Sequence, residues 1–164
     1  MATIDLSALY EQQSLLDTRI HAQNHVDYPI TMSRRVLALL VELGELANET
    51  RTFKFWSTKG PSPKAKILDE YADGLHFLLS LGLALKTSTK VFSYRVSKKT
   101  LTEQFLRCYH DFSELAEALN QKRYEKAMSS YLSLIPALGV TQQEVVDAYL
   151  TKLAINFKRQ DEKY

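Results

Sequence analysis

The sequence lacks the features that define secreted and membrane proteins. Its one cysteine, Cys108, excludes an internal disulfide framework and is typical of a reducing cytoplasm, where we interpret it as a packing residue. The N-terminal residues contain no basic segment followed by an apolar one, so no secretory signal is expected. The longest apolar run, Gly74–Leu85, is shorter than the roughly twenty residues that a membrane span requires. We therefore expect a cytoplasmic protein that does not associate with membranes.

Charge of one sign is not in excess, and residues that interrupt helices are few. The 21 basic and 19 acidic residues are interspersed, so the sequence has no basic stripe that would indicate a nucleic-acid partner. Only five glycines and four prolines occur, and the alternation typical of strands is nearly absent, whereas helical periodicity dominates. We predict an all-α helical bundle that forms a single domain over residues 1–164.

Periodicity and capping signals divide the chain into about five to six helices. Thr100 with Glu103, and Thr141 with Glu144, have the spacing of capping boxes. Residues 87–99 show no clear pattern and are expected to form a loop. The expected helices run from Asp5 to Asn24, from Thr31 or Ser33 to Phe53, from Pro63 (with Ser62 as N-cap) to about Lys86, from Thr100 through Leu119, near Tyr124–Ile135, and from Thr141 to Gln160 or beyond.

Two pairs of acidic residues are the most informative feature of the sequence. Glu42 and Glu45 form one pair, and Glu70 and Asp73 form the other; in each pair the three-residue spacing places both carboxylates on one helix face. Each pair lies in or beside an almost wholly apolar helical stretch. Carboxylates in a packed interior repel one another, so they must take up protons or bind cations. Mg²⁺ is the usual cation for clustered carboxylate oxygens, and the pairs therefore predict a metal site.

The last expected helix carries an opposite charge on one face. Lys152, Asn156 and Arg159 are spaced so that they lie on one stripe, separate from the apolar face of the helix. Lysine and arginine together suit several phosphate oxygens, arginine through its planar fork. The stripe therefore predicts either a phosphate-binding surface or an ordinary solvated face.

Three further side chains are candidates for contact with a substrate. Gln13 interrupts the apolar stripe of the first helix, where its amide could bind a base edge or lie at a subunit contact. Trp56, the only tryptophan, could stack on a base or pack in the core. His76 follows Asp73 on an apolar face, where it is either a substrate contact or a core histidine with satisfied hydrogen bonds.

These features together resemble those of a known family. The two acidic pairs resemble the metal-binding signature of the all-α nucleotide pyrophosphatases, the MazG-like superfamily, and three further segments are similar to the dimeric dUTPases within it. Gln13-Ser-Leu-Leu-Asp17 resembles their N-terminal Q-x-x-L-D segment, and FKFW, which ends at Trp56, resembles the link between their metal helices. The C-terminal K-x3-N-x2-R-x4-Y pattern, which begins at Lys152 and ends at Tyr164, resembles their phosphate-binding motif. One departure is Lys163, which stands where a glycine is usual.

The resemblance implies a Mg²⁺-dependent dUTP diphosphatase, with Mn²⁺ as a substitute, that yields dUMP and pyrophosphate and assembles as a homodimer. It also implies dUDP as a further candidate substrate. Glu42 or Glu45 would accept the proton from the attacking water. One alternative is a MazG-like pyrophosphatase for dCTP or another non-standard nucleotide, and a second is a helical interaction module without activity. The implied metal ligands are Glu42, Glu45, Glu70 and Asp73, and the implied substrate-binding residues are Gln13, Trp56, His76, Lys152, Asn156, Arg159 and Tyr164.

Overall fold

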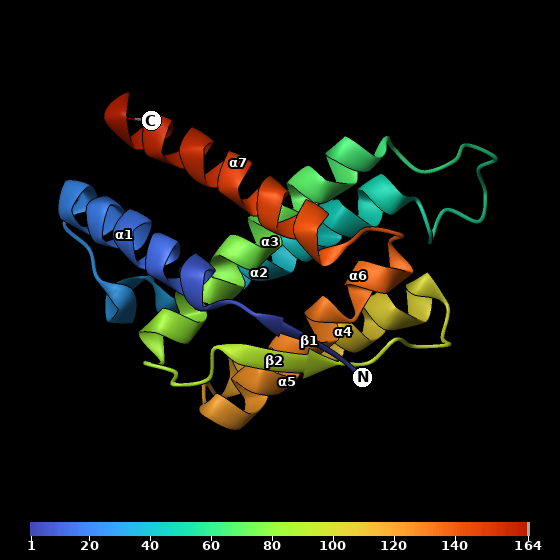
Figure 1. The fold of residues 1–164 in the computed structure, drawn as a ribbon, viewed down its shortest axis with the longest axis horizontal. Coiled ribbons are helices and arrows are strands. Elements are labelled where there is room, and N and C mark those ends of the chain that lie inside the picture. Colours follow the sequence, from blue (N-terminus) through green and yellow to red (C-terminus); the bar gives the residue numbers. More distant parts are fainter. Residues whose placement is uncertain (164) are drawn as a thin grey trace.

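The computed structural model describes residues 1–163, and helices dominate this part of the chain (Figure 1). In addition to six long helices, these residues form a four-residue helix, α6 (Leu134–Ala137), and two short strands, β1 (Ala2–Asp5) and β2 (Val91–Tyr94). The expectation of an all-α fold is confirmed, and none of these helices is long and apolar enough to cross a membrane. The long helices are α1 (Ser7–Asn24), α2 (Tyr28–Thr50), α3 (Lys64–Ala84), α4 (Leu101–Glu117), α5 (Gln121–Leu132) and α7 (Gln142–Asp161).

Helices α2 and α3 form the centre of the fold. Helix α3 packs along α2 and also contacts α1, α5 and α7. Helices α1 and α7 lie together on one side of this pair, and α4, α5 and α6 pack against one another on the other side (Figure 1). The two predicted acidic pairs therefore lie on adjacent helices, whose separation is set by helix packing.

The starts of α4 and α7 confirm the two predicted capping boxes. The hydroxyl of Thr100 accepts a hydrogen bond from the Glu103 backbone N–H (3.2 Å), and the Thr100 backbone N–H donates to the Glu103 carboxylate (2.8 Å). The corresponding distances for Thr141 and Glu144 are both 3.1 Å. Each box satisfies backbone donors that would otherwise lack partners at a helix end.

The ends of α2 and α3 differ slightly from the prediction. Helix α2 begins earlier than expected because the Asp27 side chain caps it by accepting from the Ile30 N–H (3.0 Å). Helix α3 begins one residue later, with Pro63 rather than Ser62 as N-cap. The Ser62 hydroxyl instead donates to the Glu49 carboxylate (2.5 Å), which ties the intervening loop to the end of α2.

The strands β1 and β2 show that two expectations were wrong. Residues 87–99 are not all loop, because they include β2, and α1 begins two residues after the expected start at Asp5. The strands pair in antiparallel register with Ile4 opposite Phe92. Ile4, Phe92 and Tyr94 are buried and alternate with more exposed neighbours, which is the period-two pattern of a strand. Each strand has only four residues, so this pattern did not stand out against the helical periodicity.

The helix expected near Tyr124–Ile135 is divided into α5 and α6. Helix α5 begins earlier, where the Asn120 side chain accepts from the Arg123 N–H (3.0 Å). Ser133 separates the two helices, and Pro136 in α6 lacks the N–H that would continue the helical hydrogen bonds. The segment then turns at Gly139, whose φ of 70° lies in the left-handed region that glycine adopts without strain.

Two buried tyrosines fix α3 against α5. The rings of Tyr71 and Tyr131 stack with their centroids 4.3 Å apart, and each hydroxyl donates to the backbone carbonyl of the other residue (3.0 and 2.7 Å). A Cβ atom at Gly74 would overlap the Tyr131 hydroxyl, so this close approach requires glycine. Because Gly74 follows Asp73 directly, the same contact fixes the position of one predicted metal ligand.

Candidate metal and substrate site

The two acidic pairs meet between α2 and α3. Oxygens of Glu42, Glu45 and Glu70 lie within 4.8 Å of one another, and so do oxygens of Asp69, Glu70 and Asp73. Glu70 belongs to both groups, so five carboxylates form one continuous acidic centre. Carboxylate oxygens at this separation are suited to hard divalent cations such as Mg²⁺. Asp69 was not predicted, because it lies outside the three-residue spacing that defined the pairs.

Burial and mutual repulsion favour the protonated forms of these carboxyl groups. Burial, together with the nearby charges of Asp73 and Glu45, raises the pKa of Glu42 to about 8 and that of Glu70 to about 7. Burial also raises the pKa of Asp73, although the hydrogen bond from Lys152 opposes this change. One carboxylate oxygen of Glu42 and one of Glu70 are buried without a hydrogen-bond partner among residues 1–163. Such oxygens are available to a cation.

Lys152 already supplies one positive charge to this centre. Its side chain is buried, and its Nζ lies 2.8 Å from the Asp69 carboxylate and 3.1 Å from that of Asp73. Burial alone would lower the pKa of Lys152, but the hydrogen bonds to Asp69 and Asp73 outweigh this effect and raise it. The predicted stripe on α7 is therefore divided in function: Lys152 contacts the acidic centre, whereas the other two members face the neighbouring cavity.

We expect the stability of the metal-free protein to fall as the pH rises from about 4.5 to about 8. In this range the folded protein retains a proton on Glu42 that the unfolded chain has released, so a rise in pH favours unfolding. Thermal unfolding of the wild type and of Glu42→Gln, measured across this range, will test the expectation. The unfolding temperature of the wild type should fall relative to that of the variant, and added Mg²⁺ should reverse the fall. Parallel curves for the two proteins would contradict it.

A cavity of about 460 Å³ adjoins the acidic centre between α1, α2, α3 and α7. Its size is within the range of small-molecule sites. Two metal-ligand candidates form part of its wall, so a bound molecule would lie directly beside the carboxylates. The predicted residues that line the cavity are Gln13, Glu42, Asp73, His76, Asn156 and Arg159.

The amide of Gln13 is held in one orientation. Its oxygen accepts hydrogen bonds from the Tyr149 hydroxyl (2.9 Å) and from His76 Nδ1 (2.6 Å), and its Nε2 donates to Asp17 (2.9 Å). Burial lowers the pKa of His76 to about 3, so the ring is neutral. Because the Gln13 oxygen can only accept, this contact requires the ring proton on Nδ1. The ring also stacks on Tyr149 at 4.2 Å. The Gln13 oxygen is therefore already used within the protein, and one amide N–H remains for a base edge.

A polar network that the sequence did not predict forms another wall of the cavity. The Asp17 carboxylate accepts hydrogen bonds from Ser80 (2.7 Å) and Tyr28 (2.9 Å), and the Arg35 guanidinium donates to Ser80 (2.5 Å). Arg34 also lines the cavity. Two features of the sequence could have indicated this network. They are the adjacent arginines at the polar start of α2 and the aspartate in the Q-x-x-L-D segment.

In addition to Lys152, two predicted substrate contacts are not placed in this cavity. Trp56 is 66% exposed and packs edge-on against Phe53 and Phe55 in the loop after α2, and it does not line the cavity in this chain. Tyr164 lies outside the described residues. Lys163 has a φ of 54° in the left-handed region, where a glycine would be less strained.

The comparisons with known proteins agree with this geometry. A family model described as dUTPase matches residues 5–164. This match includes both acidic pairs, the cavity and α7. No curated protein matches the sequence.

Proposed function

The chain belongs to the all-α dUTPase family and is therefore a dUTP diphosphatase, and from this premise we propose that its acidic centre binds Mg²⁺. We further propose that the adjacent cavity holds dUTP, which is cleaved to dUMP and pyrophosphate. The observation that carries the proposal is the position of the acidic centre, whose Glu42 and Asp73 form part of the wall of a cavity of about 460 Å³.

The residues present fit a divalent metal. Five carboxylates supply only oxygen ligands, and the unpartnered oxygens of Glu42 and Glu70 are the donors that such an ion requires. When bound, Mg²⁺ would neutralise charge on the phosphate oxygens and lower the pKa of a water molecule. Mn²⁺ has similar ligand preferences and is the proposed substitute.

The side chains around the metal centre have separate proposed roles. Glu42 or Glu45 accepts the proton of the attacking water, because both lie in the group of closely spaced oxygens. Arg159 and Asn156 hold phosphate oxygens from α7, where the Asn156 side chain accepts from the Arg159 guanidinium (3.4 Å). Lys152 adds its ammonium charge beside the same phosphates.

A panel of deoxynucleoside triphosphates will test the proposal. Pyrophosphate release should be fastest with dUTP and Mg²⁺, persist with Mn²⁺, and stop in excess EDTA. Faster release from dCTP would instead support the MazG-like alternative, and dUDP hydrolysis would extend the substrate range. An inactive helical module is not supported by the family match.

We predict that Gln13→Ala will reduce kcat/KM for dUTP more than it reduces residual activity on dCTP. The fixed amide leaves one N–H toward the cavity, and a site built to bind one base rejects another when its polar groups lose their partners. Steady-state kinetics with both substrates will measure the two losses. Gln12→Ala, one residue away, is the control and should leave both activities near wild type. Equal losses in Gln13→Ala would show that Gln13 does not select the base.

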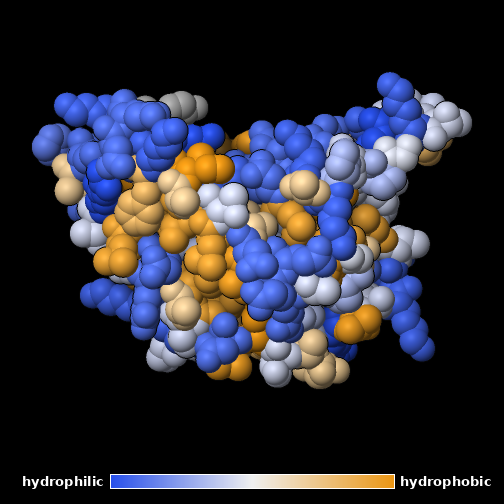
Figure 2. Space-filling view, turned by 45° about the horizontal axis from the view of Figure 1, so that its top comes forward, coloured by the Kyte–Doolittle hydropathy of each residue, from blue (hydrophilic) through white to orange (hydrophobic). Residues whose placement is uncertain are grey.

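We also propose that the protein is a homodimer. Ile30, Leu37 and Val41 form an exposed apolar stripe along α2. Hydrophobic side chains also gather on the face of the molecule that Figure 2 shows. Light scattering at micromolar concentration should give twice the 18.8 kDa chain mass. Leu37→Asp should produce the monomer, whereas Val96→Asp, at an equally exposed position, should not. A monomeric wild type would contradict the proposal.

We also propose that the protein is cytoplasmic, because its single cysteine forms no disulfide and is buried. Cys108 is fully buried, and burial raises its pKa, so it packs as an apolar residue. Its Sγ donates to the Ser130 carbonyl (3.3 Å). A reduced cysteine in the core needs no oxidising compartment.

A further inference from the structure

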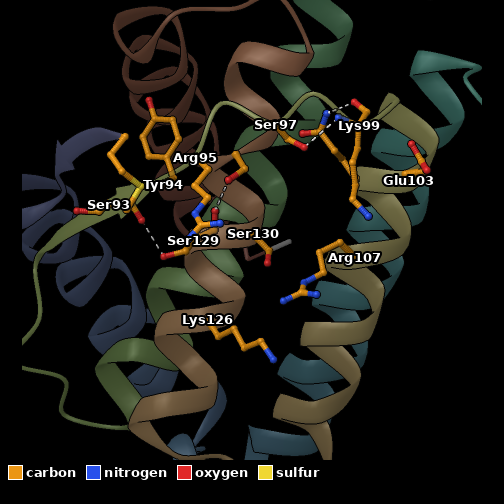
Figure 3. A pocket seen from close by; sticks show the side chains of 13 residues that line it. Ser93, Tyr94, Arg95, Ser97, Lys99, Glu103, Arg107, Lys126, Ser129 and Ser130 are labelled. Atoms are coloured by element: carbon orange, nitrogen blue, oxygen red, sulfur yellow. Dashed lines mark hydrogen bonds between the residues drawn. The ribbon is translucent and has the colours of Figure 1, made fainter.

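A second cavity, of about 540 Å³, lies on the side of the fold formed by β2, α4 and α5 (Figure 3). Its lining residues come from the end of β2, from the loop that follows it, from one face of each helix, and from Met1 and Ser133. None of these residues lines the cavity beside the metal centre. The second cavity is therefore a separate feature, and the proposed dUTP reaction does not use it.

The residues that line this cavity carry more positive than negative charge. Arg95, Lys99, Arg107 and Lys126 line it, and Glu103 is the single acidic residue among its described lining residues. The Glu103 carboxylate is already bound by the backbone and hydroxyl of Thr100 in the capping box of α4. Within residues 1–163, no ion pair involves Arg95 or Lys99. Lys126 also pairs with the Glu114 carboxylate (3.3 Å), so the unneutralised positive charge of the cavity belongs mainly to Arg95 and Lys99.

A buried carboxylate holds two of these cations in place. The side chain of Asp111 is completely buried beneath the cavity, 3.2 Å from Arg107 Nε and 3.5 Å from Lys126 Nζ. It also accepts a hydrogen bond from the Ser130 hydroxyl. Arg107 uses only Nε in this contact, so its two terminal nitrogens remain available. Figure 3 shows the Arg107 and Lys126 side chains directed into the space between α4 and α5.

The hydroxyl groups of the cavity contribute less than its charges. Ser129 donates to the Ser93 carbonyl (2.9 Å) and Ser133 donates to the Ser129 carbonyl (3.0 Å), so their protons are already used. Ser97 accepts from the Lys99 backbone N–H (3.1 Å) and retains its own proton for a ligand. A ligand would therefore be recognised mainly by multiple negative charges, with few neutral contacts.

We propose that this cavity is a second binding site for a small anion that carries two or more linked phosphates. Cations from three chain segments converge on it, and an arginine with two available nitrogens suits phosphate oxygens. The volume suits a small molecule, and the site is concave. A nucleic acid would need a longer basic surface than this one cavity provides. The linked phosphates can belong to free pyrophosphate or to the phosphate tail of a nucleotide.

Calorimetry with sodium pyrophosphate at fixed ionic strength will test the proposal. The protein should be depleted of metal and should carry Arg159→Ala, which removes the proposed phosphate contact at the other cavity. We expect pyrophosphate to bind, and Arg95→Ala with Lys99→Ala to weaken binding by roughly tenfold or more, the scale of lost charge-assisted contacts. Both side chains are exposed and form no ion pairs within residues 1–163, so the double variant should fold normally. Lys98→Ala, between them and outside the cavity, is the matched control.

The outcomes are distinct. A loss confined to the double variant supports the site. A parallel titration with ATP then identifies the source of the phosphates: equal affinities indicate free pyrophosphate, and tighter ATP binding indicates a nucleotide tail.

Absence of pyrophosphate binding at millimolar concentration would overturn the proposal. An equal loss in Lys98→Ala would also overturn it, because general surface charge would then explain the binding. Tighter binding of a short DNA duplex that does not depend on Arg95 and Lys99 would exclude a small-anion site as well.

Discussion

Asp73→Asn is expected to lower kcat by at least roughly 100-fold, the scale of removing a major electrostatic contribution to catalysis. Asparagine keeps the size of the side chain but removes the negative charge from the acidic centre, where Asp73 lies close to Asp69 and Glu70. Initial rates of pyrophosphate release at saturating dUTP and Mg²⁺ will measure the effect. Glu45→Gln should give a loss of similar size on the other side of the centre.

The fold should survive this change. Lys152 would keep Asp69 as its partner, and the loss of one repelling carboxylate should leave the unfolding temperature unchanged or higher. Glu117→Gln, at an exposed position on α4, is the matched control and should retain wild-type activity. Near-normal turnover in Asp73→Asn, or in the wild type with excess EDTA, would exclude the proposed metal mechanism.

The sequence predicted the helices well because local signals define them. Thr100 and Thr141 carry their capping partners three residues away, so both helix starts could be located without any tertiary information. Glu42 and Glu70 stood out because charged residues are rare in apolar helices. These patterns were sufficient to predict that two acidic helix faces meet, and the packing of α2 on α3 brings them together.

The features that the sequence did not predict depend on contacts between distant segments. The contact of Lys152 with Asp69 joins α7 to α3. The residue pattern within either helix alone does not indicate this partner. Gln13 is similar: its amide is bound by His76 and Tyr149 from two other helices, so a pattern in α1 alone could not reveal that its oxygen is already used. Side-chain partners across a core depend on packing geometry, which periodicity does not encode.

Arg159→Ala should cost about 2–4 kcal/mol in kcat/KM, or roughly 30- to 1,000-fold, the scale of losing a charge-assisted contact in a desolvated site. Arg159 lines the cavity beside the acidic centre and contacts Asn156 on the same face of α7. A triphosphate with bound Mg²⁺ still has oxygens that require donors, and the planar guanidinium can bind two of them. Arg159→Lys should therefore recover little activity, because an ammonium cannot reproduce this geometry. Steady-state kinetics with dUTP will measure both variants.

Lys158→Ala provides the matched control, because it removes a positive charge from the adjacent position of the same helix. The Lys158 side chain is 76% exposed, and its one ion pair within residues 1–163 is a long one with Glu162 (4.0 Å), so its loss should be nearly silent. Both variants change the net charge equally, so a general electrostatic attraction of the nucleotide to α7 would lower kcat/KM by similar amounts in the two. A large loss in Arg159→Ala alone requires a specific contact with the phosphates. Equal effects would mean that this face of α7 is an ordinary solvated surface and that the phosphates are held elsewhere.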